Sequence, residues 1–443
     1  MNSPSPLPPA ADAVAEPPAG PALPAQINLN DLQAAPLADL TALAATLGVR
    51  TDPPRPRHPL VCEITRAALA RGIAAVAEGI LEMGNEPFGF LRWPSCNFQN
   101  CPEDLYVPAV LIRQHGLAAG HRVRGTIRAG RDKEKYMALD RVTEVEGIPV
   151  ERWTAPKGFD ALTPMFPQER IILESPAFCP PTVRAVDLVA TLGRGQRGLI
   201  LAPPRSGKTI LLKHIAKAIR TAYPEIHLIL LLVDERPEEV TDFRTELDAE
   251  IYSSTFDEPA TRHVAVAELV SERAKRLVEL GTHVVILLDS ITRLSRGYNN
   301  LTSGKGRLMS GGLDTKALIK PKHFFASARN TEEGGSLTIL ATALVDTGSR
   351  ADEVIFEEFK GTGNMELHLD RELVEKRIYP ALHILKSGTR REELLFHPDE
   401  MARVQVLRKQ LAQLPPLEGM EVLLQNLKAT KSNMELLLMG MRS

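Results

Sequence analysis

The stretch from Leu201 to Leu212 reads LAPPRSGKTILL and decides how the second half of the chain folds. The apolar segment GLILA leads into it, and the segment KTILLKHIAKAI that follows has the apolar spacing of a helix. A loop that joins a strand to a helix can hold phosphate oxygens with consecutive backbone N–H groups and the helix N-terminus. We therefore expect Lys208 to reach the β- and γ-phosphates of a nucleotide, and Thr209 to offer its hydroxyl to Mg²⁺.

One position of this loop departs from the usual pattern. Ala202 stands where such loops commonly begin with glycine. A loop without a ligand is the alternative interpretation, but the flanking strand and helix favour a phosphate-binding loop.

The segments on either side of the loop indicate the fold class. Apolar runs such as GLILA, HLILLLVD and HVVILLD alternate with helical patterns after Gly193. This alternation predicts an α/β domain of RecA-like P-loop type, in which helices cover both faces of a mostly parallel sheet.

Two of the apolar runs end in acids. Asp289 closes HVVILLD and is the candidate metal carboxylate, although an acid at this place can also be a helix cap. Glu235 closes the run before RPEEV and is the candidate base that deprotonates water, the alternative being a solvated acidic turn. In KSGTRREE, Arg390 and Arg391 lie in a glycine turn from which an arginine could reach another subunit; a surface ion-pair cluster is equally compatible with this segment.

Composition and patterning argue against a membrane-spanning protein, a secreted protein and a disulfide-bonded protein. The chain has 443 residues, a formal charge of -2 and 44% hydrophobic residues, with no apolar run near the ~20 residues that span a bilayer. The N-terminus lacks the basic residues and the apolar core of a signal peptide. Cys96 and Cys101 could bind a metal, but no second pair follows, so isolated thiols in a reducing cytoplasm are the favoured interpretation of the four cysteines.

The patterning divides the chain into five parts. Residues 1–25 form a Pro/Ala tail that cannot build a core, and residues 26–83 have the leucine spacing of small helices. Short alternating strands over 84–155 predict a small barrel, of which an OB-like fold is one candidate. We expect a linker over 156–190 and the ATPase domain over 191–443.

The predicted barrel carries aromatic and basic residues. Phe88 and Phe90 alternate along PFGFLRW and would share one face, with Arg92 beyond them, as a platform on which single-stranded bases stack. Core packing is the alternative for an aromatic pair. Seven basic residues against two acids between Arg113 and Tyr136 favour binding to a phosphate backbone.

Six segments together resemble the bacterial transcription termination factor Rho family, whose members are hexameric ring ATPases that move along RNA. They are GRGQRGLILAPPRSGKT, LLVDERPEEVTDFR, STFDEPATRHV, ILLDSITRLSRGYN, ATALVDTGSRADEVIFEEFKGTGNMELHL and SGTRREEL. The likeness runs from about Phe88 to the C-terminus. It implies an RNA-dependent ATPase and RNA–DNA helicase of the cytoplasm that uses ATP and Mg²⁺, assembles as a homohexamer and pulls nascent, pyrimidine-rich RNA from RNA polymerase.

The resemblance also implies a role for individual residues. Catalytic roles fall on Glu235 as base, on Lys208 and Arg236 beside the phosphates, and on Arg390 as the arginine finger given to the adjacent subunit. Thr209 and Asp289 would hold the metal. The nucleotide would be bound by Gly193, Arg194, Gly195, Gln196, Arg197, Gly198, Arg205, Ser206, Gly207, Lys208, Thr209, Ile210, Arg236 and Tyr379, with Tyr379 stacking on the adenine. Arg205 stands where the family commonly has lysine, which would alter nucleotide affinity.

Two RNA sites follow from the same resemblance. The primary site would comprise Pro87, Phe88, Gly89, Phe90, Leu91, Arg92, Asp104, Leu105, Tyr106, Glu134, Lys135 and Tyr136. Lys305 and Arg307, in a glycine-rich loop, and Arg350 and Lys360, in a second loop, would face the hole of the ring. The segment WPSCNFQNC (Trp93 to Cys101) differs from the family and leaves the base preference open.

Two other classes of function remain. A rotary proton-translocating ATPase subunit would share the nucleotide core but would have no use for a base-stacking barrel. An RNA-binding protein that uses nucleotide only as a switch would have no use for Glu235.

Overall fold

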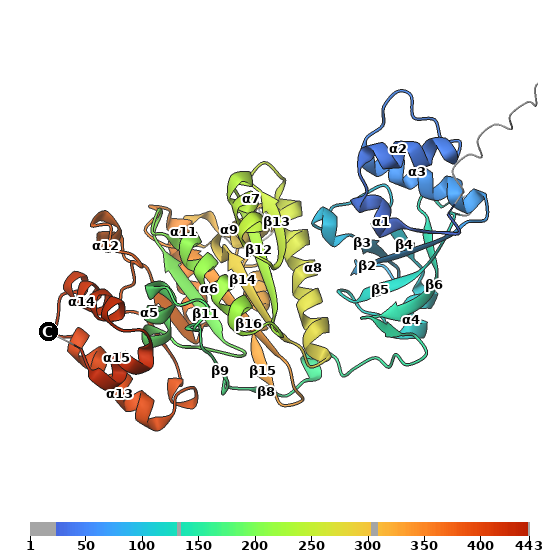
Figure 1. Ribbon diagram of the computed structural model, residues 1–443. Coiled ribbons are helices and arrows are strands. Elements are labelled where there is room, and N and C mark those ends of the chain that lie inside the picture. Colours follow the sequence, from blue (N-terminus) through green and yellow to red (C-terminus); the bar gives the residue numbers. More distant parts are fainter. Residues whose placement is uncertain (1–23, 131–133, 303–308, 442–443) are drawn as a thin grey trace, which may run out of the picture.

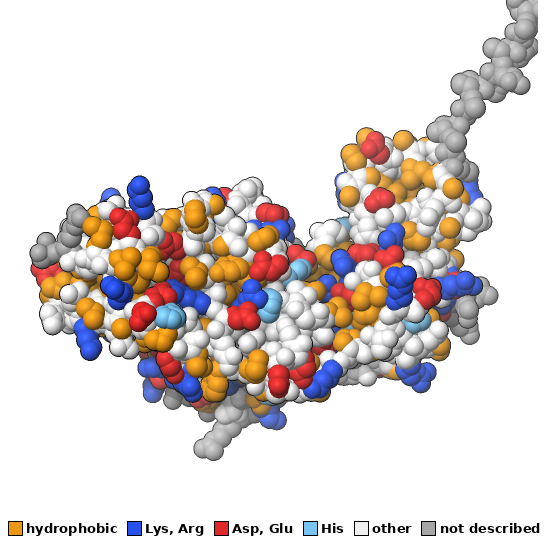
Figure 2. Space-filling view, turned by 60° about the horizontal axis from the view of Figure 1, so that its bottom comes forward, with side chains coloured by type: hydrophobic (Ala, Val, Ile, Leu, Met, Phe, Trp, Pro, Cys, Tyr) orange, Lys and Arg blue, Asp and Glu red, His pale blue; other side chains and the backbone are white. Residues whose placement is uncertain are grey.

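The computed structural model describes residues 24–130, 134–302 and 309–441. Figure 1 shows two bodies side by side, an N-terminal body in blue and cyan and a larger one that holds the central sheet and the C-terminal helices. An extended segment joins them along one side. In Figure 2 the surface is hollowed between the two bodies, and acidic and basic side chains are interspersed on the face that is seen. Within the described ranges, no helix combines the length and the apolar character that crossing a membrane requires.

Short helices open the N-terminal body, as the leucine spacing predicts. They are α1 (Leu29–Ala34), α2 (Leu37–Thr46) and α3 (Arg57–Ala70), after the short strand β1 (Gln26–Asn28). The side chain of Asn28 accepts a hydrogen bond from the N–H of Asn30 and caps α1. Leu29, Leu60 and Ile64 are fully or almost fully buried in a core shared with the barrel.

A closed barrel forms the rest of this body. Its elements are β2 (Ala74–Met83), β3 (Gly89–Arg92), β4 (Leu105–Val107), α4 (Ala109–His115), β5 (Arg122–Arg128), β6 (Ala138–Val145) and the short β7 (Ile148–Pro149). The order is β2-β3-β4-β6-β5, and β5 pairs back with β2. The OB-like barrel is thus confirmed. The barrel begins with β2, however, so Ala74–Met83 is a strand within the part expected to be helical.

Much of the segment expected as a linker packs onto the ATPase domain. It contains the 3₁₀ turn Phe159–Ala161, β8 (Pro164–Met165), β9 (Arg170–Ile171) and α5 (Pro181–Val189). β8 pairs with β15, and β9 with β10. The residues from Val183 to Val189 are all buried. The linker expectation is wrong for this part because apolar side chains three and four apart on α5 are covered by neighbouring helices.

The ATPase domain is built on a nine-stranded, mostly parallel sheet, as predicted. Strand order along its main path is β13-β12-β14-β16-β11-β17-β18. The strands of this path are β11 (Arg197–Ala202), β12 (His227–Glu235), β13 (Glu250–Thr255), β14 (His283–Asp289), β16 (Ser336–Leu344), β17 (Met365–His368) and β18 (Gly388–Thr389). β15 (Arg329–Thr331) and β8 complete the sheet, while β10 (Leu192–Gly193) pairs with β9 in a separate two-stranded sheet. β15 and β18 are antiparallel to their neighbours.

Helices cover both faces of this sheet. They are α6 (Lys208–Ala222), α7 (Pro237–Glu246), α8 (Ala260–Glu279), α9 (Ile291–Thr302), α10 (Ile319–Ala326), α11 (Arg350–Lys360) and α12 (Arg371–Glu375), with 3₁₀ turns at Ser310–Gly312 and Glu392–Leu394. Along β11, Ile200 packs into the core on the side of α5 and α6, while Leu199 and Leu201 pack into the core on the side of α8 and α9. Because successive side chains point to opposite faces, a strand buried on both must be apolar throughout, which explains the run GLILA.

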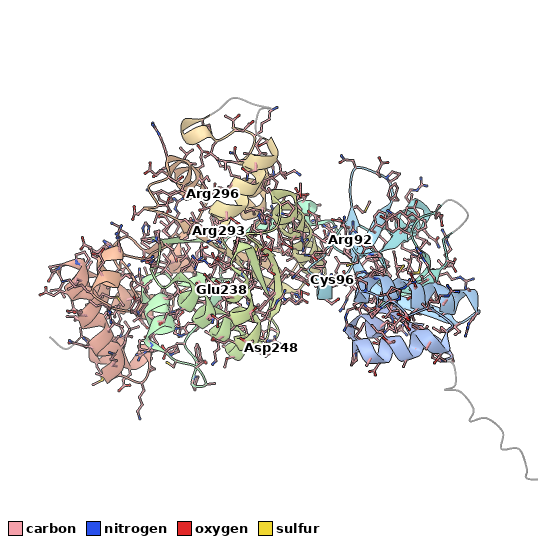
Figure 3. All side chains as sticks on the ribbon, turned by 90° about the horizontal axis from the view of Figure 1, so that it is seen from above. Arg92, Cys96, Glu238, Asp248, Arg293 and Arg296 are labelled. Atoms are coloured by element: carbon pink, nitrogen blue, oxygen red, sulfur yellow. The ribbon has the colours of Figure 1, made fainter. Side chains whose placement is uncertain are left out.

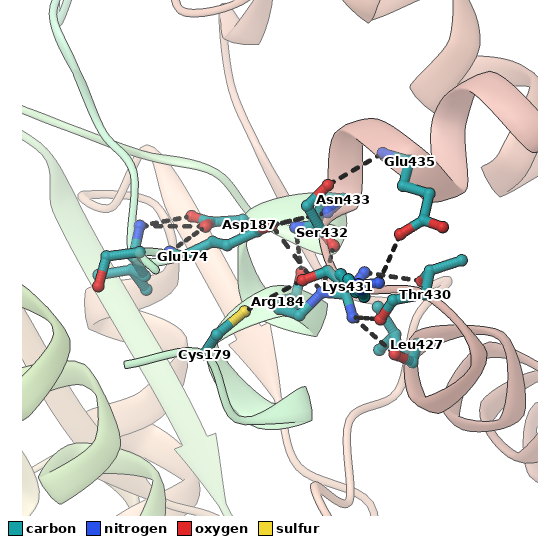
Figure 4. A network of polar contacts seen from close by, with 12 residues as sticks. Glu174, Cys179, Arg184, Asp187, Leu427, Thr430, Lys431, Ser432, Asn433 and Glu435 are labelled. Atoms are coloured by element: carbon teal, nitrogen blue, oxygen red, sulfur yellow. Dashed lines mark hydrogen bonds and ion pairs between the residues drawn. The ribbon is translucent and has the colours of Figure 1, made fainter. Parts of the chain in front are cut away.

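Three C-terminal helices complete the larger body, namely α13 (Pro398–Leu411), α14 (Pro416–Ala429) and α15 (Asn433–Met439). Figure 4 shows the polar network that attaches them to α5. The buried guanidinium of Arg184 donates to the carbonyls of Leu427 and Thr430 at 2.6 and 2.7 Å and to Oδ1 of Asn433 at 3.1 Å. Arg184 satisfies carbonyls left open where α14 ends, and so fixes the place of α15.

Candidate nucleotide and RNA sites

The loop that opens α6 has the backbone of an anion-binding turn. It follows β11 directly and ends at Gly207, the N-cap residue of α6, with φ at 82°. A φ in this range is strained for residues with a β-carbon, which accounts for the glycine. Arg205 also has a positive φ and is exposed. The predicted strand, loop and helix are all present.

Two carboxylates meet at the ammonium group of Lys208. Its Nζ lies 2.6 Å from Oδ1 of Asp289 and 3.4 Å from Oε2 of Glu235. Both acids stand at the carboxyl ends of adjacent parallel strands, β14 and β12, and are almost completely buried. Burial alone would lower the pKa of Lys208, but the charges of Asp289 and Glu235 outweigh burial and raise it, so the ammonium stays charged.

Glu235 is held from a second side by an arginine that sequence reasoning missed. Nη1 of Arg293, on α9, lies 3.1 Å from Oε1 of Glu235. Burial raises the pKa of Glu235, while Lys208 and Arg293 oppose the rise. A carboxylate with a raised pKa is a stronger base, as abstraction of a proton from water requires. Arg293 lies in the first turn of α9, four residues after Asp289. This short separation from a predicted site residue is the sequence signal that could have identified it.

The residues expected to hold Mg²⁺ fit a hard cation. Asp289 accepts a hydrogen bond from Thr342 at 2.8 Å through Oδ1, while its buried Oδ2 has no hydrogen-bond partner. Thr209 Oγ1 donates to Glu239 at 3.2 Å, an acid of α7 that was not predicted. A free carboxylate oxygen and a hydroxyl group at the mouth of the loop are ligands of the type that Mg²⁺ takes.

Tyr379 lies over the loop. A β-carbon built on Gly207 would stand 3.5 Å from the ring of Tyr379, and half of that residue is exposed. The structure therefore brings together an aromatic face and the phosphate loop, from segments far apart in sequence. Ile210 and Arg236 are exposed near the same loop, at the starts of α6 and α7, and Ser206 is buried within it.

The glycine turn from Gly193 to Gly198 does not share this pocket. It enters β11 at the amino end, whereas the phosphate loop leaves the same strand at its carboxyl end. Gly195, with φ at 87°, abuts the backbone of Asn330, where a β-carbon would come within 2.2 Å. Gly193, Gly195, Gln196 and Gly198 are buried. Within one chain the turn therefore lies apart from the phosphate loop and its glycines allow close packing; that it lines a nucleotide stays a prediction.

Arginines gather at that amino end. The N–H of Arg390 donates to the carbonyl of Asn364 at 2.8 Å, and the amide side chain of Asn364 contacts Gln196 and the backbone of Arg197. Burial lowers the pKa of Arg197, and the charges of Arg329 and Arg390 lower it further. Like charges held together favour an anion brought from outside the chain. Arg391 differs, because it pairs with Glu393 at 2.5 Å.

An aromatic cluster lies on the barrel where the base platform was predicted. Phe88 and Phe90 are 6.0 Å apart between ring centroids, and Tyr106 and Tyr136 lie 5.2 Å from Phe88 and Phe90 respectively. The four rings are half-buried rather than enclosed in the core. The guanidinium of Arg92 stands 5.2 Å from the ring centroid of Phe90. Partly exposed rings beside a cation are suited to stacking with bases.

A cavity of about 670 Å³ opens beside this cluster. Phe90, Arg92, Asp104 and Tyr136 line it, together with Lys135 and Cys101. Arg92 forms an ion pair with Asp104, whose pKa burial raises to about 6. Lys135 Nζ lies 5.5 Å from the centroid of the Tyr136 ring. Exposed Pro87 and Glu134, which pairs with Arg128, flank the cluster.

Three of the predicted RNA residues contribute to the packing of the barrel. Leu91 and Leu105 are fully buried in the barrel core, because they alternate with Phe90 and Tyr106 along their strands. Gly89 allows close approach of strands, since a β-carbon there would meet the carbonyl of Glu82 at 2.5 Å. The side chains of Leu91 and Leu105 therefore belong to the barrel core, and Gly89 serves strand packing; a part for these three residues in RNA binding stays a prediction.

The second RNA site is only partly described. Lys305 and Arg307 lie outside the described residues. Arg350 and Lys360 were expected in one loop, but they are the first and last residues of α11. A helix of this length separates its ends by about 16 Å. Arg350 adjoins Gly311, near the glycine-rich segment, and Lys360 lies at the far end.

Comparison with known proteins agrees with both halves of this description. Residues 77–151 match the model of the Rho termination factor RNA-binding domain, and residues 182–389 match that of the ATP synthase alpha/beta family nucleotide-binding domain. Transcription termination factor Rho of Akkermansia muciniphila is 51% identical over 417 residues, covering 94% of this chain and 88% of that protein. The chain belongs to the Rho family. The Rho of Cereibacter sphaeroides is 50% identical over 412 residues, covering 93% of this chain and 98% of the relative.

Solved structures share the ATPase fold at low identity. The assembled ATPase EscN of the enteropathogenic E. coli type III secretion system is 22% identical, with a TM-score of 0.51 over 64% of this chain and 65% of that one. This likeness concerns the fold alone. The barrel that matches the Rho RNA-binding model separates this Rho family chain from the rotary ATPase class.

Proposed function

We propose that this chain is an ATP-driven, RNA-stimulated motor that terminates transcription in the cytoplasm by pulling nascent RNA from RNA polymerase and unwinding RNA–DNA hybrids. The observation that carries the proposal is one chain that holds both a phosphate loop with a buried base, Glu235, and a barrel with a cluster of half-buried rings. Membership of the Rho family supports the pairing of these two sites for one purpose.

Nucleotide binding follows from the loop before α6. Backbone N–H groups from Arg205 to Thr209 and the start of the helix would hold the β- and γ-phosphates, with Lys208 between them and the acids. Thr209 and Asp289 would hold Mg²⁺, which supplies positive charge to the phosphates. Tyr379 would support the adenine ring.

Hydrolysis would use Glu235 as the base. Its carboxylate accepts the proton of the attacking water, while Arg293 and Lys208 hold the carboxylate in place. Arg236, next to the base, would lie by the phosphates. Arg390 lies too far from the loop of its own chain, so it would act on the nucleotide of the adjacent protomer.

This need for a neighbour supports a closed ring, which we propose to be a hexamer. A ring is built from heterologous contacts, in which one end of each sheet meets the opposite end of the next. ATP at such a contact would change the interface when it is hydrolysed, and loops around the hole, including the residues near Arg350, would draw the RNA through.

The barrel would capture the RNA before it enters the ring. Bases would stack on Phe90 and its neighbours, while Lys135 and the basic strands contact phosphates. The cavity beside the rings offers the guanidinium of Arg92 and the carboxylate of Asp104, groups that hydrogen-bond to the edge of a base. We propose a preference for pyrimidine-rich single strands.

The test is phosphate release by the purified full-length chain with and without polycytidylate. We expect strong stimulation by the RNA. The variant Glu235→Gln should lose turnover by about 10²–10⁴-fold while still binding ATP and RNA, because only the proton acceptor is removed. The control is Glu246→Gln at the end of α7, an exposed residue paired with Lys213, which should keep full activity.

The outcomes separate the alternative functions. ATP hydrolysis that polycytidylate leaves unchanged would reject the RNA motor in favour of a rotary type of ATPase. RNA binding without steady phosphate release in the wild-type chain would reject it in favour of a nucleotide switch.

A further inference from the structure

The segment Trp93 to Cys101 folds back on itself. A 3₁₀ turn spans Pro94–Cys96, and Asn97 and Phe98 both adopt positive φ values of 50° and 59°. The N–H groups of Cys96 and Phe98 both donate to the carbonyl of Trp93 at 3.0 Å. This reversal brings Cys96, in the turn, close to Cys101, at the end of the segment.

A third potential ligand comes from α3. One ligand atom each of His58, Cys96 and Cys101 lies within 4.8 Å of the other two. Both thiols are free. Four donors at Zn–S and Zn–N bond lengths around a tetrahedral ion stand about 3.6 Å apart, so these atoms need to move inward by only about 1 Å.

The imidazole of His58 is already oriented from behind. Its Nδ1 lies 2.7 Å from Oε1 of Glu103, a fully buried carboxylate that also accepts from Nε2 of Gln33 at 3.2 Å. The other oxygen of Glu103, Oε2, is buried without a hydrogen-bond partner. A buried acid that binds one ring nitrogen leaves Nε2 as the free one, and histidines that bind metals generally have such a carboxylate behind them.

We propose that His58 Nε2 and the thiolates of Cys96 and Cys101 bind one Zn²⁺ ion, with water as the fourth ligand and Glu103 as the residue that orients the histidine. Thiolate and imidazole are the ligands that Zn²⁺ prefers, and a Cys₂His set leaves one coordination position open. A disulfide between the two cysteines would leave the oriented histidine without a role.

The proposed zinc site lies at the base of a loop that contacts the ATPase domain. The tip of the loop docks on the ATPase domain: Phe98 stacks on Tyr252 at 4.5 Å between centroids, and Gln99 donates to Glu258 at 2.7 Å. The carbonyl of Asn97 accepts from Arg262 on α8. Figure 3 shows Arg92 and Cys96 on the side of the N-terminal body that faces the ATPase domain.

The same loop also borders the RNA cavity. The N–H of Cys101 donates to Oδ2 of Asp104 at 2.7 Å, and Asp104 pairs with Arg92 beside the aromatic cluster. A metal at the base of the loop therefore fixes a segment that contacts both the RNA cavity and α8. Resting on the proposed function, we infer that zinc couples RNA binding to ATP hydrolysis.

The experiment measures zinc in the full-length chain, purified under reducing conditions after incubation with Zn²⁺ and removal of free metal. We expect about one zinc per chain in the wild type and in the control Cys179→Ser, whose thiol lies in the segment before α5. His58→Ala, Cys96→Ser and Cys101→Ser should each lose at least about tenfold in zinc affinity. Glu103→Gln should weaken affinity by about 10–100-fold, because it disturbs only the orientation of the histidine.

Two further measurements keep the proposal open to refutation if a variant fails to fold. Co²⁺ added to the metal-free wild type should give a thiolate charge-transfer absorption that Cys179→Ser retains. Two results would overturn the proposal. The first is a wild-type chain that binds no more zinc than the Cys96→Ser, Cys101→Ser double variant. The second is a purified chain whose mass shows a disulfide between these cysteines and which takes up no zinc after reduction. Basal ATPase without RNA should be unchanged by zinc removal, while stimulation by polycytidylate should fall severalfold; the zinc measurement stands whether or not RNA stimulates the enzyme.

Discussion

Arg390 offers the sharpest test of how the ATP site is completed. It is attached through Asn364 to the amino end of β11, whereas the phosphate loop leaves the carboxyl end of the same strand. Six residues of strand separate the two ends by about 17 Å. A guanidinium at one end does not reach a γ-phosphate at the other, so we predict that Arg390 acts on the nucleotide of a neighbouring protomer.

The expected magnitudes follow from this geometry. Arg390→Ala alone should reduce turnover by about 10³–10⁵-fold, which corresponds to roughly 4–7 kcal/mol of lost transition-state stabilisation. Lys208→Ala should be similarly inactive, because it removes the ammonium group of the phosphate loop instead of the arginine from the adjacent protomer. In rings mixed from equal amounts of both variants, about a quarter of the interfaces combine an intact loop with an intact finger, so activity should return to about a quarter of the wild-type value if the sites act independently.

The assay is RNA-stimulated phosphate release after the two variants are unfolded, mixed and refolded together, with differently tagged chains to prove that mixed rings form. The matched control is Arg391→Ala, since Arg391 is already neutralised by Glu393 and should keep most of its activity. Mixed rings as inactive as either parent would refute the reasoning and place the finger within its own chain.

Three further predictions concern single side chains. Tyr379→Ala should raise the KM for ATP by about 2- to 13-fold and Tyr379→Phe should not, because the face of the ring over Gly207 provides the contact; equal effects of both changes would contradict this. Phe90→Ala should weaken binding of a pyrimidine-rich strand by about 5- to 150-fold in a fluorescence titration, with the exposed Phe256→Ala as control; unchanged affinity would remove the platform. Burial lowers the pKa of His121 to about 4, so the neutral ring is favoured in the folded barrel and the free energy of unfolding should fall by about 3 kcal/mol as the pH drops from about 6.5 to 4. Denaturant titrations across this range should show the slope in the wild type and much less of it in His121→Gln.

Much of the ATPase core could be predicted from the sequence, because its determinants are local. A glycine that needs a positive φ, an apolar run of strand length and an acid at its end are all read within about ten residues. Lys208, Glu235 and Asp289 were located in this way, since parallel strands bring their carboxyl ends to one edge of a sheet. The shared face of Phe88 and Phe90 was also predicted locally, because side chains two residues apart on a strand lie on the same side.

Other properties were decided only by the tertiary structure. The glycine turn before β11 has the composition of a phosphate-binding turn, but packing against Asn330 places it at the wrong end of the strand. Arg350 and Lys360 bracket a segment that burial of Ile355 and Phe359 makes helical, so they lie at its opposite ends. His58 meets Cys96 and Cys101 only because α3 packs on the barrel. Contacts between distant segments depend on the summed burial of many side chains, and no short stretch of sequence contains that sum.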